Sequence, residues 1–196
     1  MTILLLAGSP SAPSRSTRLL DHVGNKLVRL GHRYARLEVR DLPGQAILRA
    51  DWNDAEIKAA LATVAEASAV VVATPVYKAA YSGILKAFLD LLPQFGLTDK
   101  LVLPLATGGS QSHMLALDYA LRPVLSSLNP KHVLPSIYAT ESQVTWSEEG
   151  GLVLDAPIEA RVDEGVAQLS ASLQALHRAA PEQFHEIPFS QVRCSI

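Results

Sequence analysis

The chain has 196 residues, of which 48% are hydrophobic and 18% are charged, and its formal net charge is −2. This composition can bury one full core, so we expect one domain over residues 1–180 and a tail at 181–196. The near-neutral charge argues against nucleic-acid and anionic-membrane binding. No apolar run reaches the roughly 18 residues of a membrane span, and the N-terminus lacks a basic signal-peptide flank, so we expect a cytoplasmic protein.

Strands and helices alternate along the chain. Buried apolar runs predict five strands, at residues 3–7, 34–39, 69–74, 100–106 and 133–139. Helical spacing predicts helices at 18–30, 54–67, 82–92, 112–128 and 157–179. Gly31 is a candidate stop for the first helix, and Asn53 and Ser82 are candidate N-caps. This order predicts an α/β fold with a parallel sheet covered on both faces, and five strands favour the flavodoxin-like order 2-1-3-4-5.

The first strand ends in a loop rich in hydroxyl groups, GSPSAPSRST at residues 8–17. The free N–H groups and the dipole of the helix that follows attract an anion. The loop offers further donors from Ser9, Ser14, Arg15, Ser16 and Thr17. It matches neither GxGxxG nor GxxxxGK[ST], so it predicts a site for a phosphate monoester. The alternative is a plain helix cap, which uses only one hydroxyl.

Two further loops leave the third and fourth strands at the same edge of the predicted sheet. The second begins with Pro75, Val76, Tyr77 and Lys78, in which a proline is expected to end the strand and an aromatic ring stands beside a cation. Such a wall suits a flat conjugated ring, and the lysine suits an anionic group of a second substrate or of a reduced ligand. The alternatives are a tyrosine that packs on its own loop and a solvated lysine.

The third loop contains Thr107, Gly108, Gly109 and Ser110. Because glycine has no Cβ, this backbone can approach a flat ligand closely, although a tight turn without a ligand would use the same residues. A phosphate site, a wall for a planar ring and a glycine loop at neighbouring strand ends match the shape of FMN. The single cysteine, Cys194, cannot form an internal disulfide, so redox chemistry needs such a cofactor.

Three stretches of the chain resemble the NADPH-dependent FMN reductase family: LAGSPSAPSRST, VVATPVYKAAYSGILKAFLDLLP and VLPLATGGSQSHMLALDYALRPVL. The resemblance covers most of residues 1–140. Within the family, these stretches are most similar to the flavin reductases of two-component alkanesulfonate monooxygenase systems. Beyond residue 140 the resemblance is weaker and implies no site residue.

This resemblance implies an enzyme that reduces FMN to FMNH2 with NADPH or NADH and supplies it to a partner monooxygenase. The hydride would pass directly from nicotinamide C4 to flavin N5, without a catalytic acid, base or nucleophile from the protein. The six histidines show no HxxxH or HxxH spacing, so we expect no metal. The resemblance places the FMN phosphate at Ser9, Arg15, Ser16 and Thr17, and its ring between residues 75–78 and 107–110. Two alternatives stay open: a flavodoxin-like quinone or azo reductase with bound FMN, and a flavodoxin-type electron carrier.

The helix expected at 112–128 contains a proline, Pro123, which removes a helical hydrogen bond. We therefore expect a wide π-type turn around residues 117–119. The apolar side chains of this helix are too widely distributed for one sheet face. A homo-oligomer, dimer or tetramer, with the Tyr119 region at its interface, would cover them; the alternative is a proline kink in an ordinary core helix.

Overall fold

The structure, a computed structural model, describes residues 1–147 and 151–178. Its parallel sheet has the order β2-β1-β3-β5-β6, and β7 also pairs with β5. These strands are β1 (Thr2–Ala7), β2 (Arg33–Glu38), β3 (Ala69–Tyr77), β5 (Leu101–Gly108), β6 (His132–Val133) and β7 (Ile137–Thr140). This is the predicted flavodoxin-like α/β fold, with the fifth strand split in two. The expected tail at 181–196, including Cys194, lies outside the described residues.

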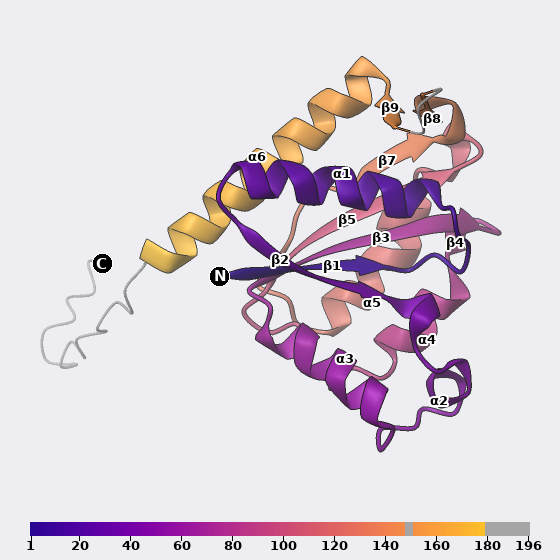
Figure 1. Cartoon of the computed structure of the whole chain (residues 1–196), viewed down its shortest axis with the longest axis vertical. Coiled ribbons are helices and arrows are strands. Elements are labelled where there is room, and N and C mark those ends of the chain that lie inside the picture. Colours follow the sequence, from indigo (N-terminus) through magenta and orange to yellow (C-terminus); the bar gives the residue numbers. More distant parts are fainter. Residues whose placement is uncertain (148–150, 179–196) are drawn as a thin grey trace, which may run out of the picture.

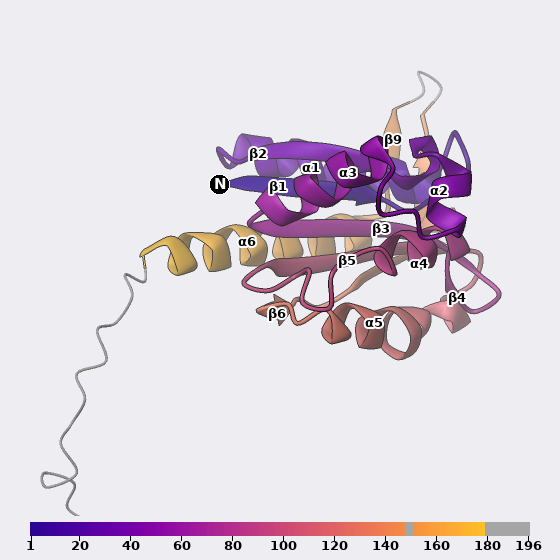
Figure 2. The same ribbon diagram turned by 90° about the horizontal axis from the view of Figure 1, so that it is seen from below.

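Six α-helices are present in the described ranges 1–147 and 151–178, and they cover both faces of the sheet. They are α1 (Arg15–Arg29), α2 (Gly44–Leu48), α3 (Ala55–Glu66), α4 (Gly83–Leu89), α5 (Arg122–Ser127) and α6 (Ala156–Arg178). Helices α1 and α6 lie on one face, and α3 and α4 lie on the other (Figures 1 and 2). No described helix has the length and apolar character that crossing a membrane requires.

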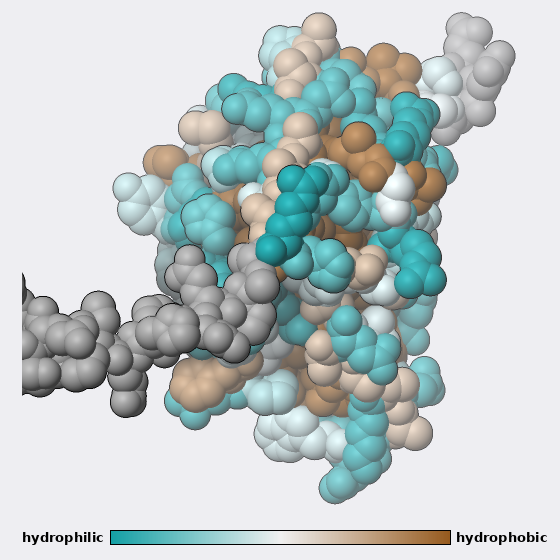
Figure 3. Space-filling view, turned by 90° about the vertical axis from the view of Figure 1, so that its left-hand side faces the viewer, coloured by the Kyte–Doolittle hydropathy of each residue, from teal (hydrophilic) through white to brown (hydrophobic). Residues whose placement is uncertain are grey.

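Each face of the sheet supports a separate apolar core, because successive strand side chains point in opposite directions. In β1, Ile3 and Leu5 belong to the core under α1 and α6. Leu4 and Leu6 of the same strand belong to the core under α2, α3, α4 and α5. At the end of the molecule where the parallel strands begin, hydrophilic and hydrophobic side chains are interspersed (Figure 3). The two cores fix the sheet, and with it the positions of the strand ends.

The fifth strand is interrupted by a proline, Pro135, between β6 and β7. Proline cannot donate a ladder hydrogen bond, which explains the break at this sheet edge. Two backbone carbonyl oxygens at the break, those of Val133 and Leu134, accept hydrogen bonds from the guanidinium of Arg122, both at 3.1 Å. A side chain of α5 therefore takes the place of strand hydrogen bonds at this edge of the sheet.

Two predicted helix starts need correction. Helix α1 begins at Arg15 and not at residue 18, because the hydroxyl of Ser14 accepts from the backbone N–H of Thr17. The N-cap of α3 is Asp54 and not Asn53. Its carboxylate accepts from the N–H groups of Glu56 and Ile57, at 2.8 and 3.1 Å. An ionised side chain at that position also interacts favourably with the helix dipole.

The predicted wide turn before Pro123 is confirmed. The expected helix at 112–128 is a 3₁₀ turn at Gln111–His113, a π-helix at Leu117–Leu121 and the short helix α5. The proline occupies the first turn of α5, where a missing N–H costs little. A small antiparallel hairpin of β8 (Val144–Trp146) and β9 (Leu152–Leu154) follows the sheet and leads into α6.

Candidate functional site

The carboxyl ends of β1, β3 and β5 lie next to one another at one edge of the sheet (Figure 1). The backbone N–H of Gly8, just beyond β1, donates to the carbonyl oxygen of Ala73 in β3 at 2.7 Å. Farther along the same edge, Pro75 of β3 pairs with Thr107 of β5. The structure thus brings together the three loops that the sequence singled out, at the position where open α/β sheets bind ligands.

The first loop leads into the N-terminus of α1, where several polar groups have no hydrogen-bond partner among the described residues. The first-turn N–H groups of Arg15 and Ser16 have no acceptor among the described residues. The hydroxyl of Thr17 is buried and also lacks a partner within residues 1–147 and 151–178. The first turn holds no acidic residue that would neutralise the helix dipole. Burying a hydroxyl without a hydrogen-bond partner costs free energy. The first loop and the first turn of α1, which we call the cradle, therefore have the chemistry of an anion site.

The serines of this loop hold its shape. Ser14 caps α1, and its hydroxyl lies 3.0 Å from the hydroxyl of Ser16, which is buried. Ser9 is buried as well, and its hydroxyl accepts from the N–H of Ser11 at 3.3 Å. At Gly8 an added Cβ would lie 2.8 Å from the Cβ of Leu85 in α4, so only glycine fits this close approach. The loop is therefore packed firmly against the α4 side of the sheet.

Arg15 extends away from its own loop toward the segment that follows β7. Its Nε donates to the carbonyl oxygen of Val144 at 3.3 Å, and its Nη1 lies 3.5 Å from Oε2 of Glu141. The Arg15 side chain is 39% exposed, so part of it faces solvent beside the first loop. Glu141 was missed at the sequence level because it lies beyond the stretches that carry the family resemblance.

The second loop is a tight β-hairpin, which corrects the expectation that Pro75 ends its strand. β3 continues through the proline to Tyr77 and turns at Lys78 and Ala79 into β4 (Ala80–Tyr81). Proline is tolerated near the end of a strand because few ladder bonds depend on its missing N–H. Lys78 and Ala79 have φ values of 49° and 61°. The mirror-image hairpin turn requires this left-handed backbone, at a cost of about 1 kcal/mol for each non-glycine residue.

Ser82 ties the second loop to the first. As predicted, it caps α4, and its hydroxyl accepts from the N–H of Leu85 at 3.3 Å. The same hydroxyl donates to the carbonyl oxygen of Gly8. The N–H of Ser82 donates to the hydroxyl of Thr74 at 3.0 Å. These buried hydrogen bonds fix the β3–β4 turn against the first loop. Tyr77 is left about half exposed.

The third loop is shorter than expected, because Thr107 and Gly108 belong to β5. The close approach that Gly108 permits is made by the protein itself: an added Cβ would overlap the hydroxyl of Tyr138 and lie 3.3 Å from the Cβ of Val76. At Gly109 the space is open, and the nearest atom is Oε1 of Glu141 at 4.0 Å. The Gly109–Ser110 segment is therefore the part of this loop with free space beside it.

Tyr138 anchors the third loop from β7. Its hydroxyl donates to the carbonyl oxygen of Ser110 at 2.6 Å. Burial raises the pKa of Tyr138, and the negative charge of Glu141 acts in the same direction. The phenol thus stays protonated and keeps donating to the loop. Tyr138 lies within a predicted strand, but nothing in the sequence pattern indicates its contact with Ser110.

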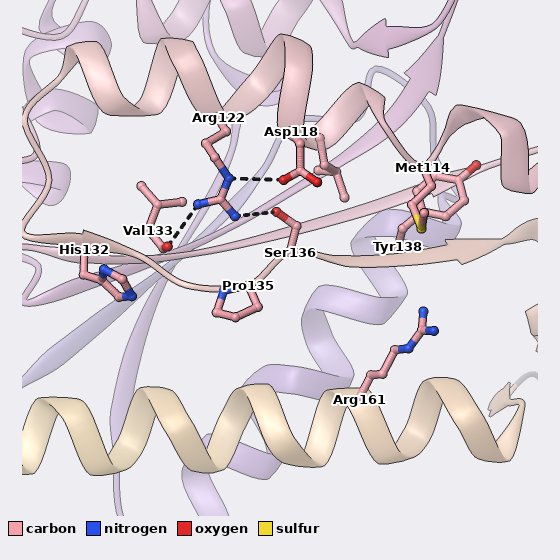
Figure 4. A pocket seen from close by; sticks show the side chains of 10 residues that line it. Met114, Asp118, Arg122, His132, Val133, Pro135, Ser136, Tyr138 and Arg161 are labelled. Carbon is pink, nitrogen blue, oxygen red and sulfur yellow. Dashed lines mark hydrogen bonds and ion pairs between the residues drawn. The ribbon is translucent and has the colours of Figure 1, made fainter.

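Two cavities lie near these loops. One, of about 440 Å³, follows the broken sheet edge between the π-helix, α5 and α6 (Figure 4). Two arginines line it: Arg161 of α6, and Arg122, which has partners in the two carbonyl oxygens at the break, Ser136 and Asp118. The other, of about 470 Å³, lies between α2, α4 and the β3–β4 turn and shares Pro10, Tyr77 and Ser82 with the first two loops. The second cavity is therefore the one continuous with the candidate site.

The fold and the strand-end loops define a flavodoxin-like protein with free hydrogen-bond donors at its first loop, among the described residues. The family model for NADPH-dependent FMN reductase matches residues 1–145. FMN reductase (NADPH) of Pseudomonas putida is 45% identical over 148 residues, 76% of this chain and 75% of that protein. The protein of the same name from Escherichia coli is 45% identical over 144 residues, 74% of this chain and 75% of that protein. An NADH:FMN oxidoreductase solved in its apo form is 36% identical with a TM-score of 0.81, over 94% of each chain.

This chain belongs to the NADPH-dependent FMN reductase family, as the resemblance of its loops indicated. It is accordingly an oxidoreductase that works with FMN and NADPH.

Proposed function

We propose that this enzyme binds FMN across the carboxyl ends of β1, β3 and β5, with the phosphate at the first loop and the ring between the second and third loops. The observation that carries this proposal is the buried hydroxyl of Thr17, which has no partner in the described part of the chain, beside first-turn N–H groups of α1 that also have none there. A phosphate monoester supplies the acceptors that these donors lack. Arg15 would add a charge-assisted hydrogen bond, and Ser9, Ser14 and Ser16 would shape or line the cradle.

The wall for the flavin ring consists of residues 75–78 on one side and 107–110 on the other. In this arrangement Tyr77 offers an aromatic face, and the backbone at Gly109 and Ser110 offers polar groups in open space. Thr107 and Gly108 support the ring site from within β5, and Pro75 and Val76 do so from β3. Lys78 would hold an anionic group of the pyridine nucleotide or of reduced flavin.

FMN supplies the ring system that accepts a hydride, so the protein needs no general acid or base of its own. The described residues bind the cofactor, fix its orientation and shield one side of it from water. Holding the reacting atoms roughly 3–3.5 Å apart would account for much of the rate gain. Firm anchoring of the loops by Ser82 and Tyr138 serves this positioning.

Reduced flavin then leaves for a partner monooxygenase, and we propose an alkanesulfonate monooxygenase system in the cytoplasm as the setting. An open site at the sheet edge suits a product that must leave. The enzyme would act as a homo-oligomer with the π-helix at the interface. Three apolar side chains in the π-helix or just before it are exposed, by 40%, 51% and 79%: Met114, Leu115 and Tyr119. An exposed apolar group of this kind is typical of a surface that another protein covers.

The activity is tested by following NADPH oxidation in the presence of free FMN, riboflavin, a quinone or an azo compound. We expect rapid oxidation with free FMN and release of the reduced product. Rapid oxidation with quinones and none with free FMN would favour the quinone or azo reductase. A tightly held flavin without turnover of NADPH or NADH would favour the electron carrier.

A further inference from the structure

The cavity of about 470 Å³ between α2, α4 and the β3–β4 turn adjoins the FMN site proposed above, and most of its lining is not assigned to the flavin. It opens beside that site, because Pro10 of the first loop and Tyr77 of the second loop line both. The residues that line it come from three segments far apart in the sequence, and Figures 1 and 2 both show α2 beside α4 at this corner. Its volume is within the usual range for small-molecule sites, roughly 300–1,000 Å³.

The cavity is mainly apolar, with surfaces that suit a flat aromatic group. Its lining includes Val39, Leu42, Ile47, Ile84 and Ala87. Two larger side chains stand at its exposed rim on separate elements: Leu48 of α2 is 82% exposed, and Tyr77 of β3 is 47% exposed. An exposed leucine and an exposed tyrosine beside one cavity leave apolar area that a bound aromatic ring would cover.

Two cations lie at the edge of the same cavity. Arg40 lines it, donates to the carbonyl oxygen of Ser11 and pairs with the carboxylates of Glu38 and Asp41. Lys78 directly follows the lining residue Tyr77 and forms no ion pair within the described part of the chain. An apolar pocket with one tyrosine and two cations at its edge has groups that suit the base and the phosphates of a nucleotide.

The reaction itself requires such a second site. A pyridine nucleotide must place its nicotinamide against the flavin ring, and its adenosine half then extends away from that contact. We infer that the cavity beside α2 and α4 binds the adenosine half of NADPH, with adenine between Leu48 and Tyr77 and the phosphate groups near Arg40 and Lys78. This inference rests on the FMN site proposed above, since the nicotinamide must reach the ring there.

A glycine in the lining allows the cavity to be filled without disturbing the core. Gly44, at the start of α2, lines the cavity, has no positive φ, and an added Cβ there would meet no atom within 4 Å. Gly44→Phe therefore adds a ring at the lining of the cavity without a clash at its Cβ, and we expect it to fill part of the space. Gln45→Phe is the matched control, because Gln45 is exposed on the same helix and does not line the cavity. Leu48→Ala, at an exposed side chain, is a second variant that does not depend on how Gly44→Phe folds.

The test measures binding of 2′,5′-ADP to the FMN-loaded protein by calorimetry, together with the KM for NADPH and the Kd for FMN. For Gly44→Phe we expect at least about a tenfold loss of 2′,5′-ADP affinity and a matching rise in KM, with the FMN Kd within about twofold of wild type. Leu48→Ala should weaken 2′,5′-ADP binding by about threefold, and Gln45→Phe should change nothing.

Unchanged 2′,5′-ADP binding in Gly44→Phe and Leu48→Ala overturns the inference. A parallel loss of FMN affinity also overturns it, because the cavity then belongs to the flavin. Failure of the proposed FMN site would be seen in a different set of proteins. There, substitutions in the first loop would leave the FMN Kd unchanged.

Discussion

Arg15 and Glu141 form an ion pair across the edge of the sheet, with Nη1 and Oε2 3.5 Å apart. The pair joins the first loop to the segment beside Gly109, because Oε1 of the same carboxylate is the nearest atom to an added Cβ there. Both side chains are partly exposed, so the pair contributes little to stability. Its importance lies in holding a carboxylate beside the guanidinium that we assign to the FMN phosphate.

The two members of this pair should affect FMN binding in opposite directions. Arg15→Ala should weaken FMN binding by about 1.5–3 kcal/mol, because it removes a hydrogen bond to a charged group. Glu141→Gln should tighten it, since a negative charge near the phosphate is lost and Arg15 keeps its bond to Val144. Fluorescence titration with FMN measures both. Unchanged FMN affinity in Arg15→Ala would show that the phosphate binds elsewhere.

The hydroxyl of Thr17 should matter for FMN and not for folding. In Thr17→Val the side chain keeps its shape and loses a buried group that has no protein partner, so thermal stability should stay the same or rise. FMN affinity should fall about tenfold, and riboflavin affinity should not change because riboflavin carries no phosphate. Thr17→Ser, which keeps the hydroxyl, is the control. Equal losses for FMN and riboflavin would contradict a phosphate contact.

Gly108 and Tyr138 should be coupled energetically. Gly108→Ala forces a methyl group into the Tyr138 hydroxyl and should cost about 1–3 kcal/mol of unfolding free energy. Tyr138→Phe removes that hydroxyl and its bond to Ser110, at about 1 kcal/mol. The double variant should be more stable than the sum of the single effects predicts, because the clash is gone. Urea unfolding of all four proteins measures this, and strict additivity would refute the proposed contact.

Because the pKa of Tyr138 is raised, the free energy of unfolding should fall as the pH rises into the alkaline range. The folded state holds the phenolic proton more tightly than the unfolded chain, because burial disfavours the phenolate. The resulting stability is fully present below the unfolded pKa of about 10 and is lost as the pH rises through the folded pKa. Burial also raises the pKa of Tyr81, which acts in the same direction, and lowers the pKa of Lys100, which acts in the opposite one. The stability of wild type relative to Tyr138→Phe isolates this one contribution. That difference should shrink with rising pH, and a constant difference would contradict it.

The exposed π-helix gives a prediction about assembly. Tyr119→Ala should lower the oligomeric state measured by light scattering, because its side chain is 79% exposed beside other exposed apolar groups. Lys131→Ala, at an exposed residue outside the π-helix, is the control. Unchanged oligomeric state together with unchanged flavin retention in Tyr119→Ala would exclude an interface role.

Much of the fold and of the candidate site follows from local sequence patterns. Apolar periodicity predicted the strand order, and the hydroxyl-rich loop predicted the start of a helix with free donors. Pro123 correctly indicated the π-helix. The break of the fifth strand at Pro135 was missed, although it has the same cause, a backbone without an N–H donor. Local patterns did not predict the close contact of Gly108 with Tyr138, because Tyr138 comes from another strand.

The contacts that complete the site were not predictable from one sequence. Arg15 meets Val144 across 129 residues of chain, and the bond from Tyr138 to Ser110 spans 28. Such contacts depend on how separate elements pack, and no local propensity encodes them. The cavity between α2 and α4 likewise exists only once both helices lie against the sheet.

A crystal structure of the enzyme with FMN tests the central claim most directly. We expect the phosphate at the N-terminus of α1, within hydrogen-bond distance of the Thr17 hydroxyl, and the flavin ring between Tyr77 and Gly109. Flavin bound at any other part of the molecule, with the first turn of α1 facing only water, would contradict it.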